Sequence, residues 1–386
     1  MKKKVLLFGP IGDFGGRDIE VNIIVKAIRD QYQTAVFSSI YITENSYAIK
    51  GLEEVEFNSF EIQIYKSNWF LRTLAQLFYR KNKKKKLPYA YLKNDISNFF
   101  FDFEKARKII LFNELKKADA VIACVQLTSS YLKEAIEICH KLNKPFFVRT
   151  TGTIRQFDIN SLHFLNKVTC FIHHSESNAN NFKKQLSLPF VIIDQCAPFE
   201  QELLAIPLDK NNKVYGYLGR LSIEKGILEL IRFFKDLDSG KLFIAGDGPL
   251  KDEMLSLINQ SKNIEYLDQI EPRDLNIFFK KISTLIIPSK EESGPLVGIE
   301  AMAAAKLILS TKVGAMAERL KNSGNDFWFD IDDQSSFFDS LAKINNLNDL
   351  EFQKIANTNR EVYLEEYQFT VIKRKYTDCL NKYLNT

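Results

Sequence analysis

The apolar residues of this chain gather in short runs, which are separated by longer segments with a helical spacing. Runs such as 5–8, 214–218 and 284–287 are continuous rather than alternating, which is typical of strands buried on both faces of a parallel sheet. Segments such as 18–28 and 130–140 have the apolar spacing of helices. Because strands and helices alternate along most of the chain, we predict doubly wound parallel sheets of the α/β class.

The length of the chain predicts two domains. Its 386 residues, of which 45% are hydrophobic and 26% charged, have an ordinary globular composition but are too many for one core. The stretch 194–212 contains Pro198 and Pro207 and no strong periodicity, so we expect it to link the two domains. From 335 to 384 the pattern is helical.

The segment 287–302 predicts a phosphate site. It follows the apolar run 284–287 and leads into a strong helix former, with Pro295 placed where the first helical turn is expected. The unpaired amides of a first turn and the positive end of a helix attract phosphate. Glu292 and Glu300 flank this site, and carboxylates beside a phosphate are best explained by sugar hydroxyls. The alternative is two solvated glutamates around an ordinary loop.

Three motifs carry a resemblance to a known family. The Glu292-x7-Glu300 pair, between a Pro-Ser turn and Glu-Ala-Met-Ala, resembles the signature of the retaining GT-B glycosyltransferases of family 4. Residues 219–226 resemble the family's Gly-Arg-Leu-x-x-x-Lys-Gly segment, and 241–249 resemble its next strand and glycine turn. The resemblance is close over 213–320 and loose over 1–20.

The resemblance implies an α/β fold of the GT-B type, with two Rossmann-like, doubly wound parallel-sheet domains that face a cleft. The first domain, 1–198, would bind the acceptor and would include the basic aromatic segment 66–106. The second domain, 199–366, would bind the nucleotide sugar. A C-terminal helix, 367–386, would cross back to the first domain.

The resemblance also implies roles for individual residues. The expected catalytic residues are Glu292, Arg220 and Lys225. The two cations would neutralise the leaving diphosphate without a metal, because its negative charge grows as the glycosidic bond breaks. Surface ion pairs are the alternative for both cations. Glu300 would bind the ribose hydroxyls, and Glu292 the hydroxyls of the sugar. The other expected donor-binding residues are Gly16, Ser293, Gly294 and Ile270, the last beside the nucleobase. Leu296 and Val297 would bind the donor through their backbone amides.

The first glycine-rich turn, 9–16, departs from a dinucleotide fingerprint. Its spacing is not Gly-x-Gly-x-x-Gly, and the second strand ends in Ser38-Ser39 without an acidic residue to hold a ribose. We therefore do not expect an NAD site. Thr151 stands where many family members have a histidine close to the transferred sugar, which puts any histidine-assisted role in doubt.

Neither a metal nor a cofactor is expected. The four histidines lack metal-site spacing, and the acidic groups Asp236-Leu237-Asp238 and 330–333 look like helix-terminus or solvated acids. The five cysteines are widely spaced and form no Cys-x-x-Cys pair, which predicts reduced core thiols in a cytosolic protein.

The basic aromatic segment predicts a second contact surface. An aromatic helix around 69–79 runs into Arg80, Lys81, Lys83, Lys84, Lys85 and Lys86, although the net charge of the chain is only +5. Such a segment is typical of an interfacial anchor on an anionic membrane. Two alternatives stay open: the aromatic residues pack on the core beside a solvated lysine loop, or the lysines bind a polyanion. We expect no specific nucleic acid, since no RNA-binding or helix-turn-helix pattern is present.

The sequence thus predicts a retaining, metal-independent hexosyltransferase that uses a UDP- or GDP-sugar. Its acceptor would be a sugar or a lipid-linked oligosaccharide in the biosynthesis of a surface polysaccharide, either lipopolysaccharide or capsule. We expect it in the cytoplasm, peripheral on the inner face of the cell membrane, since the apolar run after Lys4 ends at Gly9-Pro10. The alternatives are a sugar-nucleotide epimerase of GT-B architecture and a non-enzymatic polyanion-binding protein.

Overall fold

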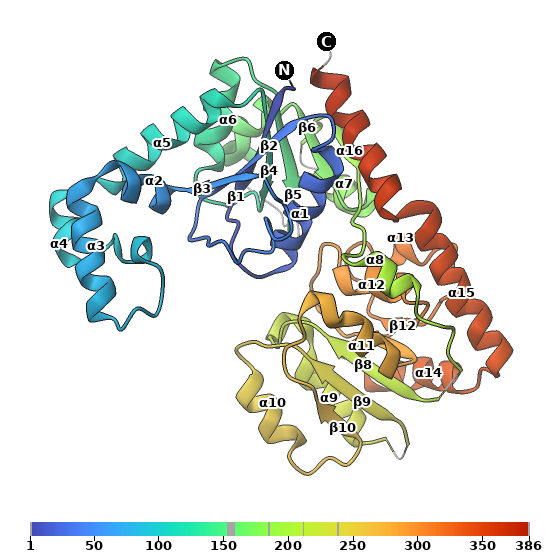
Figure 1. The fold of residues 1–386 in the computed structure, drawn as a ribbon. Helices are drawn as coiled ribbons and strands as arrows, with labels where there is room; N and C mark the ends of the chain where they lie inside the picture. The colour runs from blue at the N-terminus through green and yellow to red at the C-terminus, as the bar shows by residue number, and fades with distance from the viewer. Residues whose placement is uncertain (1, 153–158, 184–185, 211, 238, 385–386) are drawn as a thin grey trace. The chain divides into compact units, whose positions relative to one another are not determined.

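The computed structural model divides the chain into two compact units (Figure 1). It describes residues 2–152, 159–183, 186–210, 212–237 and 239–384, with side chains for all of these except 159–162. The first unit comprises Met1–His173, Asn181–Ile193 and Lys373–Thr386. The second unit comprises His174–Asn180 and Asp194–Ile372. The chain therefore passes between the units after His173, Asn180, Ile193 and Ile372. The sequence predicts domain bounds at 198 and 366.

Within the described residues, seven parallel strands form the sheet of the first unit in the order β3-β2-β1-β4-β5-β6-β7. The chain starts in the middle and winds outwards in both directions, as in a Rossmann-type sheet. The strands are β1 (Lys4–Gly9), β2 (Gln33–Ser38), β3 (Glu56–Ser59), β4 (Ala120–Val125), β5 (Phe146–Thr150), β6 (Cys170–His173) and β7 (Phe190–Ile192).

Helices cover both faces of this sheet. The helices of this unit are α1 (Gly16–Ile28), α2 (Phe60–Ser67), α3 (Trp69–Lys81), α4 (Asp95–Phe100), α5 (Phe103–Lys117), α6 (Leu132–Lys141), α7 (Glu176–Lys183) and α16 (Phe369–Leu384), with 3₁₀ turns η1 (Pro88–Tyr91) and η2 (Ile159–Lys167). Of these, α3 and α4 lie away from the sheet (Figure 1). On one face, Leu6 and Phe8 join a core with α5 and α6. On the other, Phe147 contacts the ring of Tyr383 in α16. The last helix is further held by the Tyr32 hydroxyl, 2.6 Å from Asn381 Oδ1.

The second unit repeats this plan with five parallel strands in the described residues, ordered β10-β9-β8-β11-β12. The strands are β8 (Val214–Leu218), β9 (Lys241–Ala245), β10 (Ile264–Tyr266), β11 (Thr284–Ile287) and β12 (Leu307–Ser310). The helices are α8 (Glu200–Leu204), α9 (Ile227–Lys235), α10 (Lys251–Ile258), α11 (Leu275–Lys281), α12 (Leu296–Ala303), α13 (Met316–Arg319), α14 (Gln334–Asn345) and α15 (Asp349–Glu366), with 3₁₀ turns η3 (Ile223–Lys225) and η4 (Pro272–Asp274).

Neighbouring residues of a strand in the second unit belong to two different cores, because side chains alternate across a sheet. Leu242 and Ile244 of β9 join one core with α9 and α14. Phe243 and Ala245 join the other with α11, α12 and α15. Burial on both faces explains why these strands are continuous apolar runs, and it confirms the predicted doubly wound sheets.

Three further predictions meet the structure here. All five cysteines are buried and form no disulfide, which confirms the predicted core thiols. The expected linker 194–212 is partly wrong, because it contains α8, and Leu203 and Ile206 of this stretch are buried in the second unit. Among the described residues, no helix combines the length and the apolar character needed to cross a bilayer.

The turn after β8 approaches the end of β11 so closely that Gly226 has no room for a side chain. Its φ is +67°, and a Cβ there would lie 2.1 Å from the carbonyl oxygen of Pro288. Gly324 has a similar φ of +72°, but the space around its Cβ position is open. Both glycines therefore have a left-handed backbone, but only Gly226 lacks space for a Cβ atom.

We predict that Gly226→Ala destabilises the protein more than Gly324→Ala. A left-handed backbone costs an alanine about 1–2 kcal/mol, so Gly324→Ala should lower the free energy of unfolding by that amount. Gly226→Ala should lower the free energy of unfolding further, because its Cβ atom must also displace the Pro288 carbonyl. Urea unfolding of both variants measures the difference, and equal losses would show that the close approach is wrong.

Candidate donor-binding site

The predicted donor-site residues of the second unit gather at the carboxyl edge of its sheet. Arg220 and Lys225 follow β8, and the loop with Glu292, Ser293 and Gly294 follows β11. Parallel strands bring these loops to the same edge, where ligands bind in doubly wound folds. Ile270, which is half-buried, lies after β10 at this edge as well. Gly16 is the first residue of α1 and belongs to the first unit.

Lys225 and Glu292 form an ion pair between their Nζ and Oε1 atoms. Their side chains are 24% and 16% exposed, so the pair is partly shielded from water. The Ser289 hydroxyl donates to the same carboxylate at 3.5 Å. Sequence analysis assigned Lys225 and Glu292 to different parts of a ligand and did not predict that they pair. A ligand phosphate would compete with Glu292 for the ammonium group.

The helix α12 begins as predicted, with Pro295 as its N-cap and Leu296 as its first residue. Helix geometry leaves the amides of Leu296 and Val297 without partners inside the helix. Gly298 donates its amide to the Pro295 carbonyl at 3.1 Å. These first-turn amides point to the place where an anion is favoured.

Glu300 lies in the same helix and is buried, with only 3% of the residue exposed. Burial raises the pKa of its carboxyl to about 8. Within the part of the chain that the structure describes, the Glu300 side chain forms neither an ion pair nor a hydrogen bond. A buried carboxyl without a partner is costly, so a hydroxyl-bearing ligand is the natural partner.

Arg220 is exposed and has no ion pair among the described residues. Its backbone is fixed, because the Tyr217 hydroxyl donates to the Arg220 carbonyl at 2.7 Å. The guanidinium is therefore free to bind an anion from a defined position at the edge of the sheet.

A buried polar network that sequence analysis missed holds the loop before α12. Arg319 donates to both carboxylate oxygens of Asp194, at 2.6 and 2.8 Å, and to the Pro295 carbonyl at 2.6 Å. The Asn178 side chain donates to Ser293 at its carbonyl and hydroxyl oxygens, at 3.2 and 3.1 Å. His174 Nδ1 lies 3.6 Å from Asp194. These residues lie far apart in the sequence, and no local motif indicates them.

The charge of Asp194 is stabilised by this network. Burial alone would raise its pKa, but the Arg319 guanidinium and His174 outweigh that effect and hold the pKa well below its ordinary value. Gly294 has no side chain to displace the network, since a Cβ there would lie 3.0 Å from Arg319 and 3.2 Å from His174. The network thus fixes both the loop and the first turn of α12.

Three further observations concern the neighbouring segments. Ser175 caps α7, because its hydroxyl accepts from the Asn178 amide at 3.1 Å. The Thr151 hydroxyl accepts a hydrogen bond from Arg17 at 3.2 Å. No group of three His, Cys, Asp or Glu side chains within the described ranges is placed to hold a metal ion, and Asp238 of the Asp-Leu-Asp segment lies outside them.

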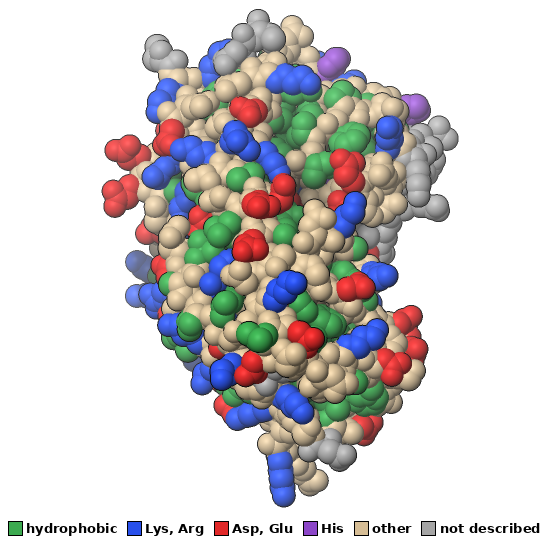
Figure 2. Space-filling view, turned by 90° about the vertical axis from the view of Figure 1, so that its right-hand side faces the viewer, with side chains coloured by type: hydrophobic (Ala, Val, Ile, Leu, Met, Phe, Trp, Pro, Cys, Tyr) green, Lys and Arg blue, Asp and Glu red, His purple; other side chains and the backbone are tan. Residues whose placement is uncertain are grey.

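The basic aromatic segment is largely exposed. In α3 only Leu71 and Ala75 are buried, whereas Trp69 is 71% exposed and Phe70 42%. The alternative, in which these aromatic residues pack on the core, is thus wrong for Trp69 and Phe70. All six cations from Arg80 to Lys86 are exposed. On the face shown in Figure 2, basic and acidic side chains are instead interspersed.

Comparison with known proteins gives a family match for part of the chain. Residues 199–361 match the model of the family Glycosyl transferases group 1. An uncharacterized glycosyltransferase of Methanocaldococcus jannaschii, MJ1607, is 27% identical over 179 residues, which are 44% of this chain and 45% of the relative. The lipopolysaccharide 1,2-N-acetylglucosaminetransferase of Salmonella typhimurium is 26% identical over 188 residues, 44% of this chain and 48% of the relative. The chain thus matches less than half the length of these curated relatives.

Solved structures extend the similarity over nearly the whole chain. A mutant of S. aureus TarM, in complex with fondaparinux, alpha-GlcNAc-glycerol and UDP, superimposes with a TM-score of 0.72 at 14% identity. The alignment covers 99% of this chain and 100% of TarM. The two parallel-sheet units therefore have the GT-B fold, and the match to the Glycosyl transferases group 1 model lies in the second unit.

Proposed function

We propose that this protein is a retaining, metal-independent glycosyltransferase of family 4. It transfers a sugar from a UDP- or GDP-sugar to an acceptor. The observation that carries the proposal is the buried Glu300 carboxyl without a partner, which lies in the helix whose first turn favours phosphate. A nucleoside diphosphate offers both a diphosphate for that turn and ribose hydroxyls for Glu300.

The remaining groups fit the same ligand. Arg220 and Lys225 bind the diphosphate and stabilise its negative charge as the bond to the anomeric carbon breaks. The acceptor oxygen then takes the place of the diphosphate on that carbon. Glu292, released from Lys225 by the phosphate, accepts hydrogen bonds from the sugar hydroxyls. The loop residues Ser293 and Gly294 and the amides of Leu296 and Val297 hold the terminal phosphate, Ile270 flanks the base, and Gly16 lets the backbone of the first unit approach the substrates.

We place this activity in the synthesis of a surface polysaccharide. The Salmonella relative is named for lipopolysaccharide, and the TarM structure was solved with UDP, so UDP is the first nucleotide to test. The acceptor we favour is a lipid-linked oligosaccharide at the inner face of the cell membrane. The exposed Trp69 and Phe70 at the start of α3 and the six exposed cations at and after its end support this choice, because aromatic residues and cations on one segment favour anionic lipid.

We predict that Arg220→Ala weakens UDP binding by about 1.5–3 kcal/mol, the range for hydrogen bonds to charged groups. Calorimetric titration of UDP and GDP into the native protein identifies the nucleotide, and the variant is then titrated with it. Arg273→Ala is the matched control, since Arg273 is an exposed arginine of the same unit, 70% exposed. A loss below about 0.5 kcal/mol for Arg220→Ala would remove Arg220 from the site.

The pKa of Glu300 predicts a pH-dependent effect of Glu300→Gln on stability. Between its ordinary value of 4.5 and about 8, the folded protein keeps a proton that the unfolded chain has lost. Native stability therefore falls as pH rises through this window, and the glutamine variant escapes that loss. The melting temperature of the variant relative to the native protein should rise from pH 5 to pH 8. A pH-independent difference would contradict the buried, neutral carboxyl.

The membrane surface is tested by vesicle flotation. We expect the native protein to float with vesicles that contain anionic lipid, and the variant with Lys83, Lys84, Lys85 and Lys86 changed to Ser to float far less, because each cation contributes about 1 kcal/mol near such a surface. The control changes four exposed lysines of the second unit to Ser, which are Lys235, Lys262, Lys321 and Lys343. Equal flotation of both variants would count against the anchor.

A further inference from the structure

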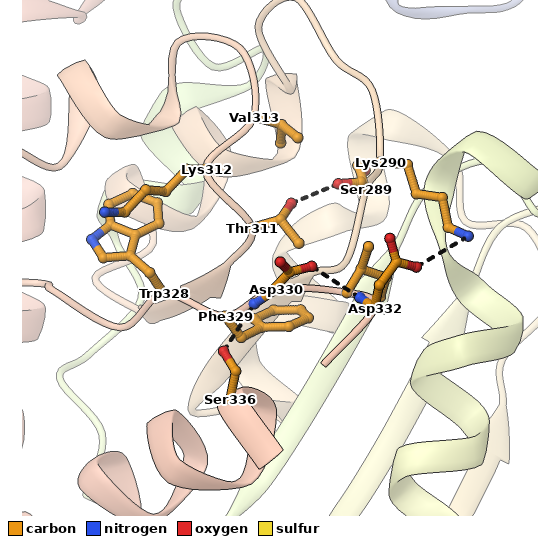
Figure 3. A pocket seen from close by; sticks show the side chains of 11 residues that line it. Ser289, Lys290, Thr311, Lys312, Val313, Trp328, Phe329, Asp330, Asp332 and Ser336 are labelled. Atoms are coloured by element: carbon orange, nitrogen blue, oxygen red, sulfur yellow. Dashed lines mark hydrogen bonds and ion pairs between the residues drawn. The ribbon is translucent and has the colours of Figure 1, made fainter. Parts of the chain in front are cut away.

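The second unit contains a cavity of about 550 Å³ beside the donor-binding edge (Figure 3). Its volume lies within the range of small-molecule sites. The cavity lies where β11 and β12 end, next to a segment that pairs with β12 through Ser310 and Trp328. It is lined by Ser289, Lys290, Thr311, Lys312, Val313, Trp328, Phe329, Asp330, Ile331, Asp332 and Ser336.

One part of the lining is apolar and fixed in position. Phe329 and Ile331 are buried to more than nine-tenths, and Trp328 is half-buried. The indole nitrogen of Trp328 donates to Asp326 at 2.5 Å, which orients the ring. Lys312 holds its ammonium 5.9 Å from the ring centroid. A rigid aromatic surface of this kind suits a ligand with an apolar ring face.

The other part of the lining carries opposite charges in equal number. Asp330 and Asp332 supply two carboxylates, and Lys290 and Lys312 supply two ammonium groups. Lys290 is partly neutralised by Glu229, at 2.7 Å. Because Glu229 already engages Lys290, the lining has no surplus of positive charge to favour an anion. It does suit hydroxyl groups, which donate to carboxylates and accept from ammonium groups.

We propose that this cavity is a second saccharide site, separate from the donor site, which binds a neutral sugar unit. The sugar packs an apolar face against Trp328 and presents its hydroxyls to Asp330, Asp332 and Lys312. That the sugar belongs to the glycan being extended rests on the proposed function, whereas the binding itself does not.

The cavity is also connected to the donor-binding loop. The Thr311 hydroxyl donates to the Ser289 carbonyl at 2.6 Å, and the Ser289 hydroxyl donates to Glu292. A sugar in the cavity therefore contacts the loop that carries Glu292. The cavity and the donor site thus share this loop. None of the residues assigned to the donor site lines the cavity.

Tryptophan fluorescence tests the proposal directly. The chain has two tryptophans, so Trp69→Phe leaves Trp328 as the only one. This variant is titrated with glucose, N-acetylglucosamine, maltose and chitobiose. We expect a saturable change in Trp328 emission with at least one of them. The monosaccharides and disaccharides distinguish a free sugar from a segment of a glycan.

Asp330→Asn in the same background should weaken saccharide binding about tenfold or more, which is the loss of one hydrogen bond to a charged group. It should leave UDP binding unchanged. Asp339→Asn is the control, because Asp339 is an exposed aspartate of α14 that does not line the cavity. No saturable change with any of the four sugars, equal effects of both variants, or displacement of the sugar by UDP would overturn the proposal. Saccharide binding without UDP binding would support this site and count against the donor site.

Discussion

The candidate site depends on the buried ion pair between Arg319 and Asp194. Loops at the carboxyl edge of a parallel sheet have no strand partner there, so side chains must hold them. Arg319 does this with three groups of its guanidinium, which bind Asp194 and the Pro295 carbonyl. A buried ion pair repays its desolvation only when its remaining donors are also satisfied, and here they are used to position the first turn of α12.

The polar groups of the candidate donor site differ in how far other side chains satisfy them. Lys225 is paired with Glu292, Arg220 extends into solvent without a partner among the described residues, and Glu300 is buried and neutral at ordinary pH. A diphosphate ligand with hydroxyls would provide partners for all four groups at once. The desolvation of Glu300 is a cost that the fold alone does not offset, which is expected of a binding site rather than of a structural core.

Much of the fold was predictable, because strands buried on both faces are continuous apolar runs. The strands β8 and β11 have the bounds that the sequence predicts, 214–218 and 284–287. The short edge strand β3, Glu56–Ser59, was not predicted, since its polar residues carry no such signal. The motifs predict the residues of the candidate site one by one. The ion pairs could not be predicted, because Lys225 and Glu292, like Asp194 and Arg319, meet only through the tertiary fold.

The lysine run raises a different question, because the fold gains little from it. Lys83 and Lys84 have positive φ values of 53° and 60°, a conformation that costs free energy in residues other than glycine. Neither forms an ion pair among the described residues. The four successive lysines, 83–86, follow a helix that begins with the exposed Trp69. Their charge is better explained by a partner outside the chain, and the exposed aromatic residues favour a lipid surface over a purely ionic polymer.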